Sequence, residues 1–348
     1  MSKINIFFLF LLAPFIGIFM VSQEFVDESK YLVMNTASMS QSVESLGKSV
    51  EDLEESIEEF GLIVEQQKEV FNQQNELITE LSDKSDNQRK LSNDIYEQKI
   101  LEMLGPAVKT HISSKTEIKI FKLAELGYRG YIAKIKLFDP NAFKVVLGKD
   151  TLGKLETTSK AAKRIGGILA INGGGFYTEN RNGKSYAQLI GNTVINGNLV
   201  EPFNGYPGDL FFTGINKRGQ VIGTVPKTEG DIMNLNPYQG VSFTPVLIRD
   251  FQKIQIPSKW AKTNQPRTII GKYSNDDLIM IVIDGRQEKW SKGVSLERVQ
   301  DKLLELGVKE AYNLDGGGSS AMYYNGALLN RPSDGRERPV VNNIVIMP

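Results

Sequence analysis

The sequence predicts an α+β fold, in which a mixed β-sheet domain with few helices follows a transmembrane helix and a coiled-coil stalk. Three observations predict it: an apolar run near the start, a heptad pattern after it, and short β-rich runs punctuated by glycine thereafter. We therefore divide the 348 residues into an N-terminal membrane anchor or signal peptide (1–21), a coiled-coil stalk (22–105) and a globular domain (106–348).

The apolar run covers residues 4–21, with Asn5 as its one polar residue. As a helix it would span roughly 27 Å, close to the hydrocarbon thickness of a bilayer. The alternative is a cleaved signal peptide, but no pair of small residues marks a cleavage site near Ser22, so we expect an uncleaved anchor. Lys3 precedes the run and acidic residues follow it. This predicts a single-pass protein of the cell membrane, with its C-terminal domain extracellular, as on a Gram-positive surface.

The stalk has a heptad pattern. Residues at alternating spacings of three and four from Val43 to Leu81 are apolar except for Gln67 and Gln74, and glutamates occupy the outer faces. Such a helix would be roughly 60 Å long. The seam is lost over residues 82–88, and a second amphipathic piece over 91–104 ends at Gly105-Pro106. We expect a homo-oligomer formed through the coiled coil, either a dimer or a trimer.

Composition excludes several kinds of chemistry. The formal net charge is zero, so no polyanion-binding surface and no nucleic-acid partner are expected. Cysteine is absent, which rules out disulfides, thiolate catalysis and cysteine-ligated zinc. The single histidine, His111, excludes histidine metal clusters and leaves a serine–histidine triad only if it is well placed. The chemistry must therefore rest on carboxylates, arginines, lysines, hydroxyls and backbone groups.

The globular region consists mostly of short runs rich in Ile, Val, Phe and Tyr. We expect strands over 116–123, 128–137, 143–147, 167–171, 193–200, 210–213, 241–248, 268–272, 278–283 and 343–347, and helices over 158–165 and 296–306. Ser295 is the expected N-cap of the second helix and Gly307 its stop. No P-loop or dinucleotide-binding fingerprint is present.

Two segments of this region share one design. Each runs an apolar stretch into a polar residue, Asn172 or Asp315, and then into three glycines. Consecutive glycines are kept where the backbone must adopt positive φ or approach another group closely, and their free N–H groups can bind an anion. A glycine-rich hairpin turn is the alternative. Two such loops in one domain predict a shared pocket at strand ends.

Further polar strand ends complete an ordered series of motifs. In chain order they are Asn172-Gly173-Gly174-Gly175-Phe176, Pro266-Arg267-Thr268, Asp284-Gly285-Arg286, Asn313-Leu314-Asp315-Gly316-Gly317-Gly318-Ser319-Ser320 and Glu337-Arg338-Pro339-Val340-Val341-Asn342. This series resembles the phosphodiester glycosidase family over about residues 118–347, while the stalk and the apolar run lie outside the resemblance. The resemblance implies a catalytic domain that hydrolyses a sugar from a glycosyl phosphodiester, here of a cell-wall, capsular or exopolysaccharide glycan.

Such a reaction needs a clamp for the phosphate and a carboxylate that attacks the sugar or activates water. Guanidinium groups match phosphate oxygens in geometry and charge. With the resemblance, this assigns as catalytic candidates Asp315, Asp284, Arg286 and Arg267. The substrate-binding candidates are Asn172, Gly173, Gly174, Gly316, Gly317, Gly318, Ser319, Ser320 and Arg338. Which carboxylate is the nucleophile or base is left open.

No cofactor is required by this scheme. Two-metal cleavage of a P–O bond usually draws on several histidine and carboxylate ligands, which one histidine disfavours. A single divalent cation, calcium or magnesium, would suit the oxygen ligands of Asp315, Asp284 or Asn172. Two other classes of function stay open: a glycan- or phosphopolymer-binding module without catalysis, and an envelope scaffold built on the coiled coil.

Overall fold

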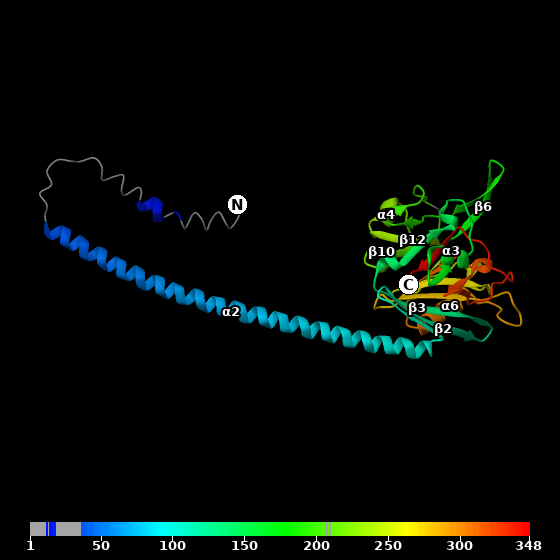
Figure 1. The fold of residues 1–348 in the computed structure, drawn as a ribbon, viewed down its shortest axis with the longest axis horizontal. Helices are drawn as coiled ribbons and strands as arrows, with labels where there is room; N and C mark the ends of the chain where they lie inside the picture. The colour runs from blue at the N-terminus through cyan, green and yellow to red at the C-terminus, as the bar shows by residue number, and fades with distance from the viewer. Residues whose placement is uncertain (1–11, 13, 19–35, 206–207, 209) are drawn as a thin grey trace. The chain divides into compact units, whose positions relative to one another are not determined.

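The computed structural model describes residues 12, 14–18, 36–205, 208 and 210–348. The chain divides into two units, Met1–Asn87 and Gln88–Pro348. All the described strands belong to the second unit, as Figure 1 shows. The candidate site residues therefore all lie in one structural unit.

The long helix α2 (Thr36–Leu104) is continuous over 69 residues. The helix therefore continues through residues 82–88, where the heptad seam is lost. The helix ends where the sequence predicts, because Gly105 adopts a φ of 75° and its N–H donates to the carbonyl of Leu101 at 2.9 Å. Glycine reaches this left-handed conformation without a steric penalty and so terminates the helix.

The predicted transmembrane helix is not found among the described residues, and this part of the fold prediction is corrected. In the part of the chain that the structure describes, no helix is long and apolar enough to cross a membrane. The long helix α2 fails because charged residues recur along it. The predicted span, residues 4–21, lies outside the described residues except for positions 12 and 14–18.

The largest sheet has eight strands. Its order is β1 (Lys109–Ile112), β2 (Thr116–Glu125), β3 (Tyr128–Leu137), β16 (Leu278–Ile283), β15 (Arg267–Lys272), β17 (Glu310–Leu314), β13 (Val246–Arg249) and β14 (Gln252–Lys253). All pairs among the described strands are antiparallel, so the prediction of a mixed sheet is wrong. Short hairpins such as β2–β3 and β15–β16 connect neighbours, where parallel strands would need long crossovers.

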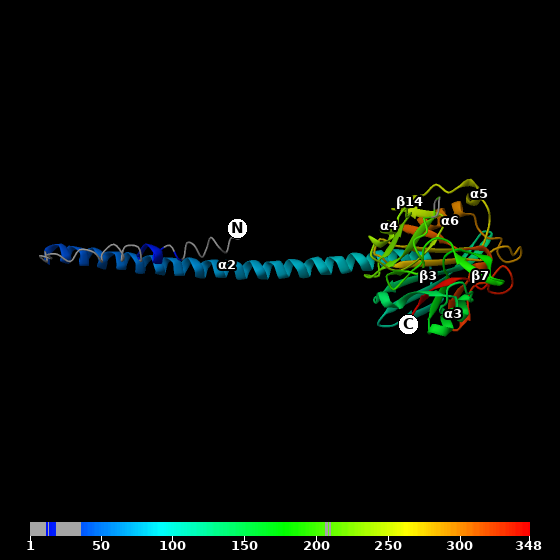
Figure 2. The same ribbon diagram turned by 90° about the horizontal axis from the view of Figure 1, so that it is seen from above.

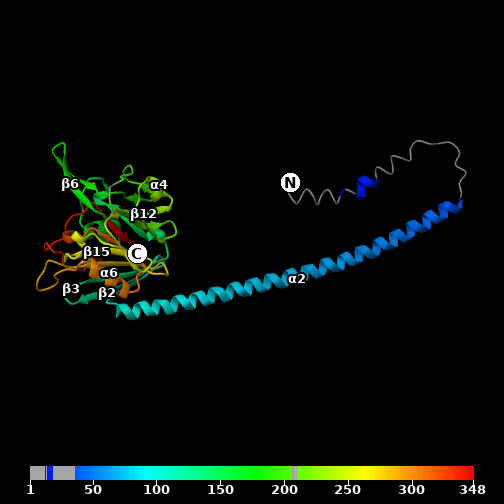
Figure 3. The same ribbon diagram turned by 180° about the vertical axis from the view of Figure 1, so that it is seen from behind.

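Three smaller sheets complete the domain. One contains β11 (Val221–Thr224), β10 (Phe211–Asn216), β12 (Pro237–Phe243), β8 (Val194–Ile195) and β9 (Asn198–Leu199). Another contains β19 (Ala327–Leu328), β18 (Met322–Tyr324), β5 (Leu169–Asn172), β20 (Asn342–Ile346) and β4 (Phe143–Leu147). The third is the hairpin of β6 (Phe176–Arg181) and β7 (Lys184–Leu189), which extends away from the body of the domain (Figure 3). The short helices are α3 (Thr158–Ile165), α4 (Glu229–Met233), α5 (Ser258–Ala261) and α6 (Leu296–Glu305).

Both faces of the eight-stranded sheet are buried. On β16, Met280 and Val282 face a core shared with the five-stranded sheets, while Ile279 and Ile281 face a second core shared with α6. Alternate side chains of a strand point to opposite faces, so this continuous apolar run serves both cores. Helices α6 and α3 accordingly lie on opposite sides of the domain in Figure 2. The sheet is thus a rigid central layer whose strand ends can position a site.

Several predicted elements coincide with the observed ones. Strands β3, β4 and β16 and helix α3 have the predicted bounds, and the Ser295 side chain accepts a hydrogen bond from the backbone N–H of Arg298 as the N-cap of α6. The predicted strand 241–248 is instead two strands, β12 and β13, in different sheets. Pro245 lies between them, and a proline cannot donate a ladder hydrogen bond inside a sheet.

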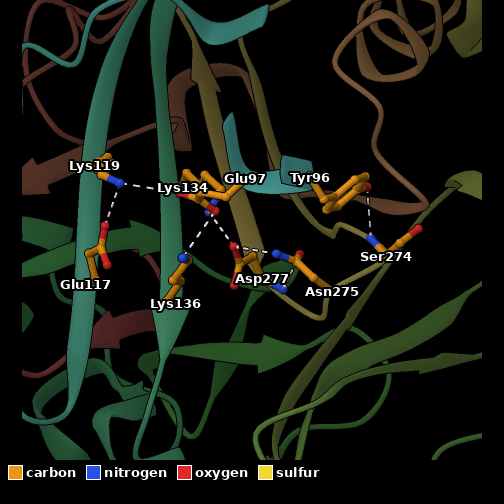
Figure 4. Close-up of polar contacts among 9 residues, drawn as sticks. All are labelled: Tyr96, Glu97, Glu117, Lys119, Lys134, Lys136, Ser274, Asn275 and Asp277. Carbon is orange, nitrogen blue, oxygen red and sulfur yellow. Dashed lines mark hydrogen bonds and ion pairs between the residues drawn. The ribbon is translucent and has the colours of Figure 1, made fainter. Parts of the chain in front are cut away.

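The last turns of α2, from Gln88 on, belong to the second unit and pack against its core. Ile100 is fully buried in the core that also contains α6. Beside it, Glu97 accepts a hydrogen bond from the buried ammonium of Lys134 at 2.6 Å, and Lys134 also pairs with Asp277 (Figure 4). Tyr96 accepts from the backbone N–H of Ser274 at 3.3 Å. The structural unit therefore begins within α2, upstream of the predicted stalk boundary at residue 105.

Candidate active site

Asp315 follows directly on β17, at the end of the central sheet. Its backbone N–H donates to the carbonyl of Gly173 at 3.2 Å, and its own carbonyl accepts from Nδ2 of Asn172 at 2.5 Å. The two glycine loops that share one design in the sequence therefore meet in space. Strand β17 and strand β5, which belong to different sheets, fix the position of Asp315 between them.

A pocket of about 320 Å³ lies at this point. Its lining residues are Phe243, Thr244, Pro245, Trp260, Gln265, Arg267, Arg286, Leu296, Asn313, Asp315, Gly316, Gly317, Gly318 and Arg338. Asp315 is the one carboxylate among these lining residues, and three arginines accompany it. Of the predicted site residues, the pocket thus brings together Asp315, the three arginines and the second glycine loop.

The arginines have few counter-charges. Arg267 donates from Nε to the carbonyl of Val294 and from Nη2 to the carbonyl of Thr263, and Arg286 donates from Nε to Oε1 of Gln265. Among the described residues, neither has an ion-pair partner within 4 Å. Arg338 pairs with Asp334 at 2.9 Å near the surface. The pocket therefore carries excess positive charge, which favours an anionic ligand.

The pKa values of the pocket reflect this arrangement. Burial, together with the nearby charge of Arg286, lowers the pKa of Arg267 to about 10, so its guanidinium stays protonated at neutral pH. Burial raises the pKa of Asp315 to about 6, against the opposing effects of the Ser319 hydroxyl, the Gly316 N–H and the charge of Arg338. A carboxylate that titrates near neutral pH is suited to exchange a proton with a substrate or with water.

Asp284 lies elsewhere. It is 1% exposed and is not among the residues lining the pocket. Its Oδ2 accepts from Nε1 of Trp290 at 2.8 Å, and its Oδ1 accepts from Nδ2 of Asn330 at 3.0 Å and from the backbone N–H of Arg331 at 2.9 Å. Burial raises the pKa of this carboxyl, while these three donors oppose the increase. These hydrogen bonds connect Asp284 to the loop that carries Trp290 and to the loop that carries Asn330 and Arg331.

Asn172 supports the site from beneath. It is fully buried, and its Oδ1 accepts from Oγ1 of Thr268 at 2.8 Å and from the backbone N–H of Ala321 at 3.1 Å. With the bond from Nδ2 to Asp315, its amide joins β5, β15, β17 and the start of β18. The side chain thus has its hydrogen-bonding capacity used by the protein. It holds the Asp315 loop in place and does not line the pocket.

The first glycine loop, residues 173–175, packs closely against neighbouring strands. A Cβ atom on Gly173 would lie 2.3 Å from Oδ1 of Asn342, and one on Gly174 would lie 2.6 Å from the carbonyl oxygen of Ser242. The N–H of Gly174 donates to the same Asn342 oxygen at 2.8 Å. Glycine is therefore required because the backbone runs against β20 and β12.

The second glycine loop lies against the arginines. Gly317 has a φ of 60°, as the sequence argument for positive φ requires, and a Cβ on it would lie 3.1 Å from Nη2 of Arg286. A Cβ on Gly318 would lie 2.1 Å from Nη2 of Arg338. The N–H groups of Gly317, Ser319 and Ser320 donate to backbone carbonyls. These donors are engaged within the protein, so anion binding rests mainly on the guanidinium groups.

The two serines have different environments. Ser319 is 2% exposed and its hydroxyl donates to the carboxylate of Asp315, so it orients the acid. Ser320 is buried, its hydroxyl has no hydrogen-bond partner among the described residues, and it does not line the pocket. Sequence reasoning missed Gln265, which holds Arg286, and the lining residues Phe243 and Thr244. Only Gln265 carried a signal, since it precedes the Pro266-Arg267 motif.

The oxygen ligands proposed for a cation do not converge. In the described ranges, no three or more His, Cys, Asp or Glu side chains form a group that could hold a metal ion. Asn172 and Asp284 direct their oxygens to protein donors, and Asp315 alone of the three lines the pocket.

The comparisons with known proteins now bear on this geometry. The family model described as "Phosphodiester glycosidase" matches residues 166–347, just over half of the chain. The chain belongs to the phosphodiester glycosidase family. The resemblance inferred from the ordered motifs is thereby confirmed, and all the pocket-lining residues of this family member lie within the matched range.

Individual relatives agree with this assignment. An N-acetylglucosamine-1-phosphodiester alpha-N-acetylglucosaminidase of Bos taurus is 28% identical over 194 residues, covering 51% of this chain and 35% of the relative. The SPbeta prophage-derived uncharacterized protein YomE of Bacillus subtilis is 29% identical over 199 residues, covering 55% of this chain and 29% of the relative. The chain thus spans about a third of the length of these curated relatives.

A solved structure shows the same fold. The catalytic domain of zebrafish N-acetylglucosamine-1-phosphodiester alpha-N-acetylglucosaminidase, auto-inhibited by its pro-peptide, superposes with a TM-score of 0.56 at 25% identity, covering 70% of this chain and 87% of that one. A hypothetical protein from Synechocystis, 15% identical with a TM-score of 0.54, shares the fold, with coverage of 70% of this chain and 64% of that one. The second unit is therefore a phosphodiester glycosidase domain in both sequence and architecture.

Proposed function

We propose that this chain hydrolyses a sugar from a glycosyl phosphodiester in the pocket at Asp315. The observation that carries the proposal is a single titrating carboxylate in a pocket that three arginines line. The arginines suit the phosphate in charge and in forked geometry. The names of the mammalian and zebrafish relatives give the same substrate class for those proteins.

In the proposed mechanism, Asp315 acts as a general base. Its carboxylate takes a proton from water, the water oxygen attacks C1 of the sugar, and the C1–O bond to phosphate breaks. The electron pair of that bond leaves with the phosphate, which Arg267, Arg286 and Arg338 stabilise as charge accumulates. A phosphomonoester is a good leaving group, so no second carboxylic acid is needed to protonate it. The hydroxyl of Ser319 and the backbone N–H of Gly316 donate to the Asp315 carboxylate and keep it oriented.

This scheme predicts inversion at C1. A retaining reaction needs a nucleophile and a second acid/base residue about 5 Å from it. Asp284, the other predicted carboxylate, has its oxygens occupied by Trp290, Asn330 and Arg331. With Asp315 as sole base, a water molecule displaces the phosphate in one step, and an α-linked substrate gives the β-anomer first.

The experiment is a sugar-release assay. The purified full chain is incubated with an α-N-acetylglucosaminyl phosphodiester and with a teichoic-acid-type polymer that carries glycosyl phosphate, and the first anomer is identified by proton NMR. Turnover that Asp315→Asn reduces to a small residual rate and that the remote exposed variant Arg218→Gln retains would support the proposal. Absence of turnover on all glycosyl phosphodiesters, or sugar binding that survives Asp315→Asn without any turnover, would point to a binding module.

We further propose that the natural substrate is a wall, capsular or exopolysaccharide glycan reached outside the cytoplasm. Support comes from the charge asymmetry around the apolar N-terminal run, of which the structure describes only positions 12 and 14–18. Fractionation of cells that express the full chain, with protease added outside, tests the setting. A domain protected inside intact cells would contradict it.

We also propose that α2 associates with a second copy of the chain. Seam residues such as Val50, Leu53 and Ile57 are 52%, 61% and 64% exposed on the described helix. Apolar side chains in a heptad seam bury themselves by pairing with another helix. Analytical ultracentrifugation of the full chain and of a Leu53→Glu, Ile57→Glu variant tests this. A wild-type chain that sediments as a monomer at micromolar concentration would contradict it.

A further inference from the structure

A second cationic feature lies on the loops next to the pocket. The guanidinium carbon of Arg331 is 3.7 Å from the centre of the Trp290 ring, and that of Arg129 is 4.6 Å from it. Both arginines are exposed, and no carboxylate of the described chain lies within ion-pair distance of either. Stacking on an aromatic ring holds a guanidinium while leaving its N–H donors free at the edge. We call these three residues the Trp290 platform.

Asp284 explains how the platform is held. It accepts from the indole N–H of Trp290 and from the backbone N–H of Arg331, so one buried carboxylate fixes both the ring and the segment that carries an arginine. The charge of Arg331 in turn acts to lower the pKa of Asp284, against the effect of burial. A buried acid at a strand end thus supports two surface cations whose own donors remain available.

The Trp290 platform is adjacent to the proposed active site. Trp290 follows the pocket residue Arg286 by four positions in one loop, which limits their Cα separation to about 14 Å. Gln287 ties the two loops together by donating from Nε2 to the carbonyl of Arg331 at 2.9 Å. A cavity of about 480 Å³ lies between these loops, and Gln287, Asn330 and Arg331 line it.

We propose that the Trp290 platform is a second phosphate subsite, which binds the neighbouring phosphate of a polymeric phosphodiester whose scissile phosphate lies at Arg267, Arg286 and Arg338. The inference rests on the proposed function and narrows its substrate class from small diesters to polymers that carry repeated phosphates. The two arginines are held by stacking and offer forked N–H donors that suit phosphate oxygens, and the cavity that Arg331 lines gives a polymer room to continue.

Binding of phosphate chains tests the subsite without requiring turnover. Inorganic polyphosphate of several tens of units and pyrophosphate serve as probes, titrated by calorimetry into the full chain. The platform predicts that wild type binds polyphosphate more tightly than pyrophosphate. The double variant Arg129→Gln, Arg331→Gln should weaken polyphosphate binding about tenfold, as expected for the loss of charge-assisted hydrogen bonds, and leave pyrophosphate binding unchanged. Arg218→Gln, an exposed arginine outside the site, is the matched control.

A comparison of kinetic constants is the second test of the subsite. On a polymeric glycosyl phosphodiester the double variant should raise KM with kcat unchanged, and on a small diester both constants should equal those of wild type. Equal polyphosphate affinity in the double variant and wild type would overturn the subsite, as would an equal loss of pyrophosphate binding. If wild type hydrolyses neither substrate, the proposed function fails, while the binding arm still decides whether the platform holds phosphate.

Discussion

Glu97 connects the end of α2 to the central sheet, and its replacement by glutamine should destabilise the second unit. Its carboxylate accepts from Lys134 at 2.6 Å and lies 3.3 Å from Lys136 and 3.4 Å from Lys119 (Figure 4). Burial acts to raise the pKa of Glu97, but these ammonium groups outweigh it and lower the pKa from 4.5 to about 2. Lowering it by that much corresponds to about 3 kcal/mol of stability at neutral pH.

The pH dependence has a definite sign. Because the folded-state pKa is below the ordinary value, the contribution is fully present above pH 4.5 and is lost as pH falls toward about 2. Glutamine removes this contribution at all pH values. Urea unfolding followed by tryptophan fluorescence reports on the right unit, since Trp260 and Trp290 both lie in it. The midpoint of Glu97→Gln should be about 1 M lower at pH 7, and the difference from wild type should shrink between pH 4.5 and pH 2.

Glu102→Gln is the matched control, because Glu102 is an exposed glutamate on the same helix. Its urea midpoint should equal that of wild type. Equal midpoints for Glu97→Gln and Glu102→Gln at pH 7 would refute the reasoning, and would mean that the ammonium groups near Glu97 do not stabilise the folded unit.

Three further predictions concern the site. Asp284→Asn should lower the thermal unfolding midpoint, because its amide N–H₂ would face either the indole donor of Trp290 or the donors of Asn330 and Arg331. The pH dependence of sugar release should stay that of wild type, and an altered pH profile would assign Asp284 to the chemistry. Asn172→Ala removes the amide that supports the Asp315 loop and leaves buried donors unpaired, so the free energy of unfolding should fall by about 2 kcal/mol. The substitution should also lower kcat more than it raises KM. An unchanged kcat would contradict the supporting role of Asn172. Excess EDTA should leave sugar release unchanged, because protein donors engage two of the three candidate cation ligands, Asp284 and Asn172. Loss of activity that calcium or magnesium restores would show a required cation.

The sequence predicted well what depends on local pattern. Strand β16 is a continuous apolar run bounded by polar residues, and helix α3 has an N-cap at Thr157 and a glycine stop at Gly166, so their bounds could be predicted. The end of β17 at Asp315 followed in the same way, since an apolar run meets three glycines there. The ordered motifs then placed Arg267, Arg286 and Arg338 near it, and the structure brings them into one pocket.

What depends on distant partners could not be predicted. Asp284 and Asp315 look alike in sequence, and the difference arises because Asn330 and Arg331, far along the chain, donate to Asp284. The strand directions of the sheet likewise follow from pairings such as β16 with β3, which no local pattern encodes.

The central claim is that Asp315 acts as the base in the arginine-lined pocket, and the pH dependence of kcat/KM tests it most directly. The pKa of Asp315 is raised to about 6, and a base must be ionised to accept a proton. For an α-N-acetylglucosaminyl phosphodiester, kcat/KM of wild type should rise tenfold per pH unit below about 6 and level off above it. The residual activity of Asp315→Asn should lack that rise. A wild-type rate that falls as pH increases through 6, or a rise that Asp315→Asn retains, would contradict the claim.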